Sequence, residues 1–393
     1  MILGASILQL PAIQQAKAMG LDVVAVDMNP EAIGFKEEGI VKEVISTIDI
    51  LAVVEAAKRH HIDGVMTLAS DMPMRTVAAV SKELGLVGID EETAVKATSK
   101  ALMRDCLKAH HVPIPQYYKV HNAEEYQQAV RQFKDWFIVK PADNSGSRGI
   151  YLVKNIKDGT EIEKAYAYSR EFSRSGAVMV EEYMRGREVS VETLSLDGEV
   201  NVIQITDKIT TGAPYFVEMG HTQPTAFPSE TAERIREVAR SAVKAIGIKN
   251  GPSHTEIMVT NEGPKIVELG ARLGGDCITT HLVPLSTGVN MVECCIRIAL
   301  GEKPDCSVKY HKGSAIRYFP SHSGILTSVT GLKEANEIGG VKQVSLVNCI
   351  GDSISDIHNS ADRIGFVIAQ GDDAYTASRS AESALKCIQV GID

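Results

Sequence analysis

Several features that would identify common classes of protein are missing from this sequence. No apolar run approaches the ~20 residues that a membrane-spanning helix needs, and residues 1–4 lack the basic region of a signal peptide. Basic residues are not in excess, because 41 Lys and Arg stand against 50 Asp and Glu, for a net charge of -9. A net anion repels nucleic acid and anionic membranes alike, so we expect neither as a partner.

Cysteine pairs are also missing. The seven cysteines are an odd number, no CxxC pair occurs, and adjacent Cys294 and Cys295 are too close for an ordinary disulfide and are expected to pack in a helix. This usage indicates a reducing compartment, and we expect a cytoplasmic protein. The full set is Cys106, Cys277, Cys294, Cys295, Cys306, Cys349 and Cys387.

Internal repeats and low-complexity segments are absent as well. The chain has 393 residues, of which 44% are hydrophobic and 23% charged, close to the average of globular proteins. Such a chain buries enough apolar surface to offset its ordering entropy, which argues against disorder. Its length predicts two to four domains.

The first 95 residues alternate strand and helix patterns. We expect strands at residues 2–3, at 23–26 before Asp27, and at 64–68, with the first strand starting a few residues upstream of Met1. Helical spacing of apolar residues covers 51–60 and 73–84. Repeated strand–helix units predict a parallel sheet with right-handed crossovers.

The middle of the chain has a different pattern. A helix is expected from residue 98 or 99 to 110, and strands at 136–141, 150–153 and 177–183. Two hairpins are expected, at 189–205 around Asp197-Gly198 and at 254–269 around 261–263, with a helix at 231–246. From about residue 310 short strands and Gly turns precede a closing helix at 374–387.

A loop rich in small residues, 143–150, lies between two of these strands. Backbone N–H groups in such a loop approach phosphate oxygens closely, and Lys140 just upstream would add positive charge. It is not a P-loop, because no Gly-Lys-Ser/Thr follows it and no helix opens on it. The alternative is an ordinary surface turn.

The hairpin at 254–270 carries two carboxylates. With Thr260 opposite Pro264, Glu256 would lie directly opposite Glu268, and facing carboxylates repel unless a cation lies between them. Mg²⁺ prefers such ligands and shares them with phosphates. The alternatives are that one Glu faces solvent or that Lys265 pairs it. Arg272 would lie beside the same pocket, either stabilising a transferring phosphoryl group or forming a structural ion pair.

Other charged residues are less specific. The stretch 181–188 places carboxylates at a strand end and after a turn, and its simplest interpretation is a solvated face. Candidates for holding a substrate carboxylate or phosphate are Lys208, His221, Arg317 and Arg363, although His221 is equally explained as a satisfied loop histidine.

Taken in order, Lys100, Lys140, the 143–150 loop, residues 181–188, the Glu256/Glu268 hairpin and Arg272 resemble the ATP-grasp superfamily of carboxylate–amine ligases. The branches most similar are the phosphoribosylglycinamide synthetase-like, carbamoyl-phosphate-synthase-like and amino-acid ligase branches. The resemblance covers the whole chain and implies an α/β and α+β fold. An N-terminal parallel α/β domain would span 1–95 and a two-lobed ATP-grasp region 96–310, with a lid lobe at about 110–185 and a catalytic lobe at about 186–310. A small C-terminal α+β domain would span 311–393.

The resemblance also implies roles for individual residues. Lys100 and Lys140 match phosphate-contacting lysines, Glu256 and Glu268 the Mg²⁺ ligands, and Arg272 the catalytic arginine, with Lys140 also counted as catalytic. His254 is then a neighbour of the metal hairpin rather than a base. The nucleotide-binding set comprises Lys100, Lys140, Ser145, Gly146, Ser147 and Gly149 of the lid loop, Glu181, Glu182 and Tyr183 near adenine, and Glu188 at the ribose.

One position departs from the family pattern. The superfamily usually has Asn two residues after the second Glu, where this chain has Gly270. One or two Mg²⁺ ions are expected. Because Gly270 replaces the Asn that helps to hold a metal, the sequence does not decide whether the second ion binds. The implied chemistry is phosphorylation of a small carboxylate by ATP, and the carboxylate is expected to be an amino acid. Attack of an amine then gives an amide, with release of ADP and phosphate. A homodimer is expected from the resemblance alone.

Four alternatives remain at this stage. Asp27 after the second strand suggests a nicotinamide oxidoreductase, but residues 4–9 lack the second and third glycines of GxGxxG. A non-catalytic ATP- or metabolite-binding module is favoured only by Gly270. Within the ligases, bicarbonate activation of the carboxylase type, or a phosphoribosyl-amine substrate of purine synthesis, would use the same nucleotide site.

Overall fold

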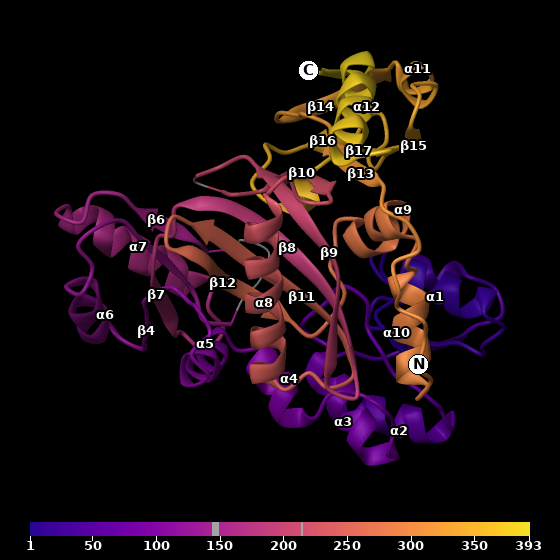
Figure 1. The fold of residues 1–393 in the computed structure, drawn as a ribbon, viewed down its shortest axis with the longest axis horizontal. Helices are drawn as coiled ribbons and strands as arrows, with labels where there is room; N and C mark the ends of the chain where they lie inside the picture. Colours follow the sequence, from indigo (N-terminus) through magenta and orange to yellow (C-terminus); the bar gives the residue numbers. More distant parts are fainter. Residues whose placement is uncertain (144–148, 214) are drawn as a thin grey trace.

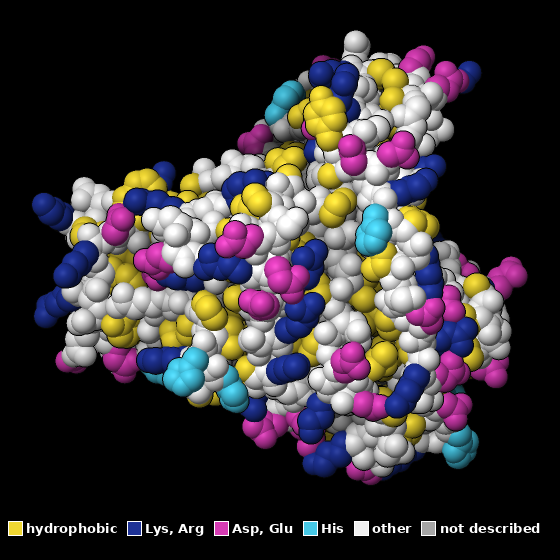
Figure 2. Space-filling model, in the orientation of Figure 1, with side chains coloured by type: hydrophobic (Ala, Val, Ile, Leu, Met, Phe, Trp, Pro, Cys, Tyr) yellow, Lys and Arg dark blue, Asp and Glu magenta, His cyan; other side chains and the backbone are white. Residues whose placement is uncertain are grey.

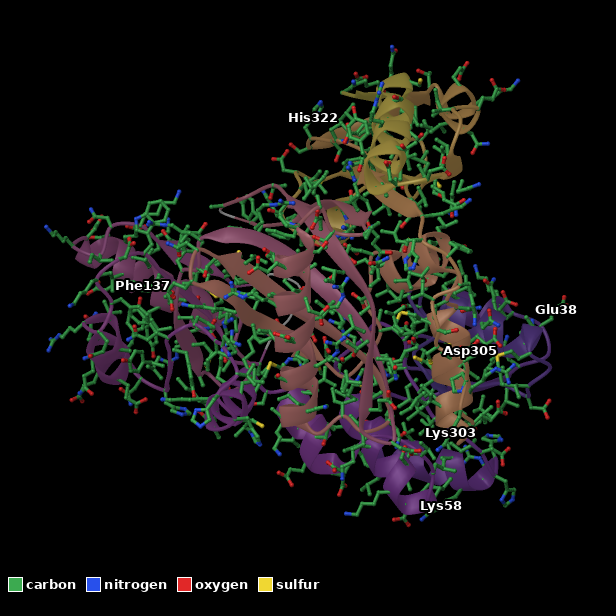
Figure 3. The ribbon with its side chains drawn as sticks, in the orientation of Figure 1. Glu38, Lys58, Phe137, Lys303, Asp305 and His322 are labelled. Carbon is green, nitrogen blue, oxygen red and sulfur yellow. The ribbon has the colours of Figure 1, made fainter. Side chains whose placement is uncertain are left out.

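The structure, a computed structural model, describes residues 1–143, 149–213 and 215–393. A long central sheet carries a helical and α/β block below it, a smaller sheet-and-helix lobe at one side, and the C-terminal segment above it (Figure 1). The side lobe, which we call the lid lobe, comprises residues 117–182. In Figure 3, Phe137 lies within the lid lobe, Glu38 at the outer edge of the N-terminal block, and His322 in the C-terminal segment.

The N-terminal block contains a parallel sheet, as predicted. Its strands β1 (Ile2–Leu3), β2 (Val24–Asp27) and β3 (Val41–Val44) pair in that order. The fourth strand predicted at 64–68 is wrong as an element, because only an isolated bridge forms between Ile2 and Met66. The pairing rests on two backbone hydrogen bonds, from Leu3 N–H to the Met66 carbonyl and from Met66 N–H to the Met1 carbonyl. The accompanying helices are α1 (Leu10–Ala18), η1 (Ile33–Lys36), α2 (Ile50–Arg59), α3 (Met74–Leu84) and α4 (Glu91–Ala97).

Helix α5 (Lys100–Ala109) leads into the lid lobe. The lid sheet is antiparallel, in the order β4 (Tyr117–Val120), β7 (Val178–Glu182), β5 (Phe137–Pro141), β6 (Tyr151–Val153). Helices α6 (Ala123–Val130) and α7 (Gly159–Glu171) supply its core with Tyr126 and Ile162. The strand–loop–strand predicted around the 143–150 loop is therefore present as β5 and β6.

The central sheet has eight strands and continues into the C-terminal segment. Its order is β12 (Gly263–Gly270), β11 (Gly251–Thr260), β8 (Gly186–Leu196), β9 (Glu199–Thr210), β10 (Glu218–Gln223), β13 (Gly313–Tyr318), β17 (Gly365–Gly371), β15 (Val341–Leu346). Because β10 pairs with β13 antiparallel, the central sheet includes strands from both sides of the boundary predicted at 310/311. The domain limits themselves stay predictions.

Both predicted hairpins of this sheet form. Strands β8 and β9 are joined at Asp197 and Gly198, whose φ values of 49° and 84° are those of a tight hairpin turn. Helix α8 (Ser229–Ile246) lies against the sheet (Figure 1) and buries Ile235, Ala239 and Ile246 at helical spacing. On its outer face, Lys and Arg side chains alternate with Asp and Glu (Figure 2), as expected of a solvated surface.

The C-terminal segment adds a small sheet in the order β16 (Ser353–Ile354), β14 (Gly324–Thr330), β18 (Gln389–Ile392). It also contains α11 (Leu332–Asn336), η3 (Ser360–Asp362) and α12 (Ala374–Cys387), the last as predicted. Between the two parts lie η2 (Ile278–Leu282), α9 (Val283–Thr287) and α10 (Met291–Ala299). Within the described residues no single helix has the length and apolar character to cross a membrane, although Ile278–Thr287 and Met291–Ala299, bent by 113°, meet those two criteria jointly.

Candidate active site

The two glutamates of the β11–β12 hairpin face each other. Glu256 lies directly opposite Glu268, as predicted, but the assumed register was wrong: Thr260 is opposite Gly263 and Val259 is opposite Pro264. A bulge between Glu256 and Ile257 restores the pairing by leaving Val267 without a partner in the ladder. The bulge thus aims both carboxylates to the same face of the hairpin.

The carbonyl left free by this bulge is used by a residue that sequence reasoning missed. Arg104 on α5 donates from Nη2 to the Val267 oxygen at 2.7 Å. It lies four residues after Lys100, so both side chains share one face of the helix. That i, i+4 spacing is the signal that could have identified it.

Lysine side chains neutralise both hairpin glutamates. Lys100 Nζ forms a short ion pair with Glu268 Oε1, and Lys208 Nζ lies 3.0 Å from Glu256 Oε1. Lys265, the alternative partner predicted from sequence, pairs with Glu182 and Glu262 instead. The repulsion between the glutamates is therefore relieved by cations from α5 and β9.

Lys208 lies at the centre of a carboxylate cluster. Its Nζ also lies 2.6 Å from Glu188 and 3.2 Å from Glu218. Burial alone would lower the pKa of Lys208, but Glu188, Glu256 and Glu218 raise it well above its usual value. This lysine was predicted as a substrate contact. The structure places it beside Glu256 of the hairpin.

His254 lies beside the hairpin, as expected, and is charged. Its Nδ1 lies 2.6 Å from Glu192 Oε1, and its Nε2 lies 3.6 Å from Glu256 Oε1. Burial would lower the pKa of His254, but Glu192 overrides this and raises it to about 9. An imidazolium at neutral pH stabilises Glu256 and does not accept a proton.

Lys140 and Glu181 form a buried cluster with Arg104. Lys140 Nζ lies 2.6 Å from Glu181 Oε2, and Arg104 donates to both oxygens of Glu181 at 3.0 and 3.1 Å. Burial would raise the pKa of Glu181, but Arg104 and Lys140 lower it to about 2. Burial lowers the pKa of Lys140. We call these three residues the buried cluster.

The remaining predicted nucleotide residues are spread along β7, β8 and the lid loop. Glu182 pairs with Lys265 Nζ at 3.1 Å, and the Tyr183 ring lies 5.7 Å from that of Trp136. Glu188 faces Lys208. Gly149 has φ 78°, and a Cβ there would lie 2.6 Å from Phe172 Cβ, so only glycine fits. Ser145, Gly146 and Ser147 lie outside the described residues.

Arg272 is held by a residue of the N-terminal block. Asp71 accepts from its Nε at 3.0 Å and its Nη2 at 3.1 Å, a bidentate ion pair. Sequence reasoning missed Asp71. It follows residues 64–68, and the position just beyond the carboxyl end of a parallel strand is where α/β sheets place functional side chains.

The same ion pair explains Gly270. A Cβ at this position would lie 2.7 Å from Asp71 Oδ1 and 3.1 Å from Arg272 Nε. The Asn side chain usual in the superfamily would collide with the Asp71–Arg272 pair. In this chain the Asp71 carboxylate of the N-terminal block therefore lies in the space that a side chain at position 270 would enter.

Three further predicted residues meet in a second cluster between the central sheet and the C-terminal segment. Arg363 pairs with both oxygens of Asp276 at 2.7 Å, and His221 Nε2 lies 3.3 Å from Asp276 Oδ2. Arg317 lies close by, donating to the His221 carbonyl at 3.1 Å and lying 3.2 Å from Glu382. Burial would raise the pKa of Asp276, but Arg363 and His221 lower it well below its usual range.

A cleft of about 440 Å³ opens beside the hairpin. Its walls come from helices α3, α4 and α5 and from the residues flanking the lid sheet at 142–143 and 174. Glu268, Lys100 and Asp71 line it, whereas the buried cluster does not. Among the predicted site residues that the structure describes, Lys100 and Glu268 alone line this cleft.

The donor set fits magnesium shared with a nucleotide. Glu256 and Glu268 would offer oxygen ligands to a metal ion, and in the described part of the chain no three His, Cys, Asp or Glu side chains are gathered closely enough to form a complete metal site. Mg²⁺ typically takes one or two carboxylates and completes its shell with phosphates and water. Two opposed glutamates flanked by Lys100 and Lys208 match that requirement.

Comparison with known proteins identifies relatives of this chain. Residues 133–280 match the ATP-grasp domain family, and residues 317–393 match the L-amino acid ligase C-terminal domain 2 family. An uncharacterised protein of Sinorhizobium fredii is 29% identical over 337 residues, 85% of this chain and 69% of that protein. The L-arginine-specific L-amino acid ligase of Bacillus subtilis is 26% identical over 284 residues, 70% of this chain and 68% of that protein.

A solved structure shows the same fold. The L-amino acid ligase from Bacillus licheniformis superposes with a TM-score of 0.86 at 22% identity, covering 100% of this chain and 98% of that one. The predicted fold class is confirmed, and the relatives with an assigned activity confirm the predicted class of enzyme, an ATP-grasp ligase. From its domain match, its relatives and its carboxylate hairpin, the chain is a member of the ATP-grasp superfamily.

Proposed function

We propose that this protein joins a small carboxylate, an amino acid, to an amine through an acyl phosphate made from ATP. The carboxylate oxygen takes the γ-phosphoryl group, and ADP leaves. The amine nitrogen then attacks the acyl carbon, the carbon–oxygen bond to phosphate breaks, and the amide nitrogen loses a proton. The products are an amide, ADP and phosphate.

The observation that carries the proposal is the opposed pair Glu256 and Glu268 beside Lys100 and Arg272. Bound Mg²⁺ would neutralise and orient the phosphates of the nucleotide. Lys100 and Lys140 hold positive charge at the ends of α5 and β5, where we place the phosphates, and Arg272 offsets negative charge during transfer. Asp71 holds Arg272 in a fixed orientation for that role.

The C-terminal segment supports amino acids as substrates. Its match to the L-amino acid ligase C-terminal domain includes Arg317 and Arg363, and Arg363 pairs with Asp276, four residues after Arg272. We assign the carboxylate-donor end of the site to His221, Arg317 and Arg363. The family match at the C-terminal segment favours an amino acid over bicarbonate or a phosphoribosyl-amine as the substrate.

Two further expectations accompany the proposal. All seven cysteines are free thiols, which suits the reducing cytoplasm where we expect the enzyme to act. The homodimer expected from the resemblance stays a prediction.

The experiment is a matrix of amino acids and small amines, tested in pairs with Mg²⁺ and ATP for release of ADP and phosphate. At least one pair should give ADP, phosphate and an amide in equal amounts, identified by mass spectrometry. Omission of either partner should lower ADP release to background. Nucleotide binding without turnover for any pair would instead favour a non-catalytic binding module.

A further inference from the structure

One buried carboxylate beside the site has no role in the proposed reaction. Glu192 on β8 is fully buried, and its partner His254 on β11 is 6% exposed. A carboxylate that leaves water loses most of its hydration, and a single buried ion pair often fails to recover that cost. Stability is therefore a weak reason for this pair to exist, and its place in the sheet indicates another reason.

The register of the central sheet lines up three side chains. Glu192 lies directly opposite His254 in the β8–β11 ladder. Side chains two residues apart on a strand point to the same face, so His254 and Glu256 share one face of β11. His254 meets a carboxylate on each side, since Nδ1 lies 2.6 Å from Glu192 Oε1 and Nε2 lies 3.6 Å from Glu256 Oε1. The imidazole therefore connects a buried carboxylate to a proposed metal ligand.

The loop after Arg272 closes over Glu192 and His254. A Cβ at Gly274 would lie 2.7 Å from His254 Nδ1 and 2.8 Å from Glu192 Oε2. Among the described residues, His254 is the only hydrogen-bond partner of the Glu192 side chain, because Glu192 Oε2 is buried without one. A rotation of the imidazole would break that bond and leave the carboxylate unpaired, which holds the ring in its observed orientation.

The contacts of Glu256 are all on one of its two oxygens. His254 Nε2 and Lys208 Nζ both approach Oε1, at 3.6 Å and 3.0 Å. Oε2 of Glu256 contacts no donor or cation of the described residues. Glu268 has the same arrangement, with Lys100 at its Oε1. Each hairpin glutamate thus has one oxygen held by cations and one oxygen free of them within the described chain.

We propose that His254, held by Glu192, is a positioning residue that fixes Glu256 through Oε1 and so presents Oε2 to the metal ion. The inference rests on the proposed function and adds two residues to the site. Carboxylates that bind metal ions are commonly oriented by hydrogen bonds from residues behind them. Lys208 does not fix Glu256 alone, because its flexible side chain is shared with two further glutamates.

Binding of Mn²⁺, used in place of Mg²⁺, separates this role from a structural one. Free Mn²⁺ is measured by electron paramagnetic resonance during titration of each protein in the presence of ADP. His254→Asn keeps a donor near Glu192 but is too short to reach Glu256, and it should weaken Mn²⁺ binding by roughly tenfold or more. His254→Gln reaches further and should recover part of the loss. Glu192→Met removes the acceptor at similar volume and should behave like His254→Asn.

Turnover should show the same defect as a need for more metal. The Mg²⁺ concentration that gives half-maximal ADP formation should rise by roughly tenfold in His254→Asn, whereas kcat at saturating Mg²⁺ should stay within about threefold of wild type. Binding of ADP in the presence of a chelator, measured by calorimetry, should not change. Thr255→Val is the matched control, because Thr255 is the next residue of β11, faces the opposite side, and has a buried hydroxyl without a partner in the described chain.

Several results would overturn the inference. They are wild-type Mn²⁺ affinity in folded His254→Asn and Glu192→Met, an equal loss in Thr255→Val, an equal loss of ADP binding without metal, and absence of Mn²⁺ binding to the wild-type protein with ADP. A lower unfolding temperature with unchanged Mn²⁺ affinity would show that the pair is only structural. Weakened Mn²⁺ binding in His254→Asn, together with no ADP release by wild type for any carboxylate–amine pair, would support the positioning role and remove the proposed reaction.

Discussion

The Glu256/Glu268 hairpin and the buried cluster use the same residue types but differ in access. Glu256 and Glu268 side chains are 25% and 35% exposed, whereas Glu181 and Lys140 are 5% and 9% exposed. Glu268 pairs with Lys100, and Glu256 pairs with Lys208 and more distantly with His254, whereas both oxygens of Glu181 are held by Arg104 and Lys140. The hairpin glutamates can exchange their lysine partners for a metal ion that also binds phosphates. In the buried cluster, release of a partner would leave a buried charge uncompensated, at too high a cost in free energy.

The largest expected effect is on ADP formation, and it should follow a substitution in the hairpin rather than in the buried cluster. Glu268→Ala should lower ADP formation at least 1,000-fold, because it removes one of the two proposed magnesium ligands. Its unfolding temperature should stay within a few degrees of wild type, since Glu268 is partly exposed. Activity retained within tenfold would remove the magnesium assignment.

The opposite pattern is expected for the buried cluster. Glu181→Gln leaves Arg104 and Lys140 without a compensating charge, which should lower the free energy of unfolding by about 3–5 kcal/mol. Urea denaturation measures this loss, and Glu182→Gln, one residue along the same strand but paired at the surface with Lys265, is the matched control. A loss under 1 kcal/mol would show that the cluster is not needed for folding.

Lowering the pH should also reduce the stability that the buried cluster provides. The pKa of Glu181 is lowered from 4.5 to about 2 in the folded protein, so the folded state binds fewer protons than the unfolded state between those values. This stabilisation is present above pH 4.5 and is lost as the pH falls toward 2. Wild type should lose about 3 kcal/mol more than Glu181→Gln over that interval. Urea unfolding at stepped pH tests this, and parallel curves for the two proteins would contradict it.

The smallest expected effect concerns Gly270, which lies beside the ion pair between Asp71 of the N-terminal block and Arg272. Gly270→Ala places a Cβ 2.7 Å from Asp71 Oδ1, a flexible side-chain end that can move away from Arg272. We expect about a tenfold loss of kcat, equal to about 1.4 kcal/mol, with a change in stability under 1 kcal/mol. Gly275→Ala is the control, because its Cβ would meet only Ala69 Cβ at 3.9 Å. Equal kinetics in the two variants would show that the Asp71–Arg272 geometry is not required.

The sequence predicted the elements that carry the site because their signals are local. The turn residues Asp197-Gly198 and 261–263 specified two hairpins, and the closing helix appeared at Ala374–Cys387 as expected. The facing of Glu256 and Glu268 was predicted from an incorrect register. A one-residue bulge, which has no clear sequence signal here, compensated for the error.

The partners of the site residues were not predictable in the same way. Arg104 contacts Glu181, 77 residues away, and Asp71 contacts Arg272, 201 residues away. Such pairs depend on how the N-terminal block and the lid lobe pack against the central sheet, which no periodicity reports. Lys265 was an alternative partner for the hairpin by sequence, but the packing of the lid sheet against the central sheet places it beside Glu182.

The amino-acid order by itself therefore determined the family, the succession of strands and helices, and the residue types available for phosphate and metal. Turn residues, apolar spacing and the order of motifs can all be recognised in the sequence without knowing how distant segments pack. Only the tertiary structure decided which charges neutralise one another and why Asp71 and Arg272 crowd position 270. Electrostatic pairing depends on distance and burial, and both are set by the packing of segments far apart in the chain.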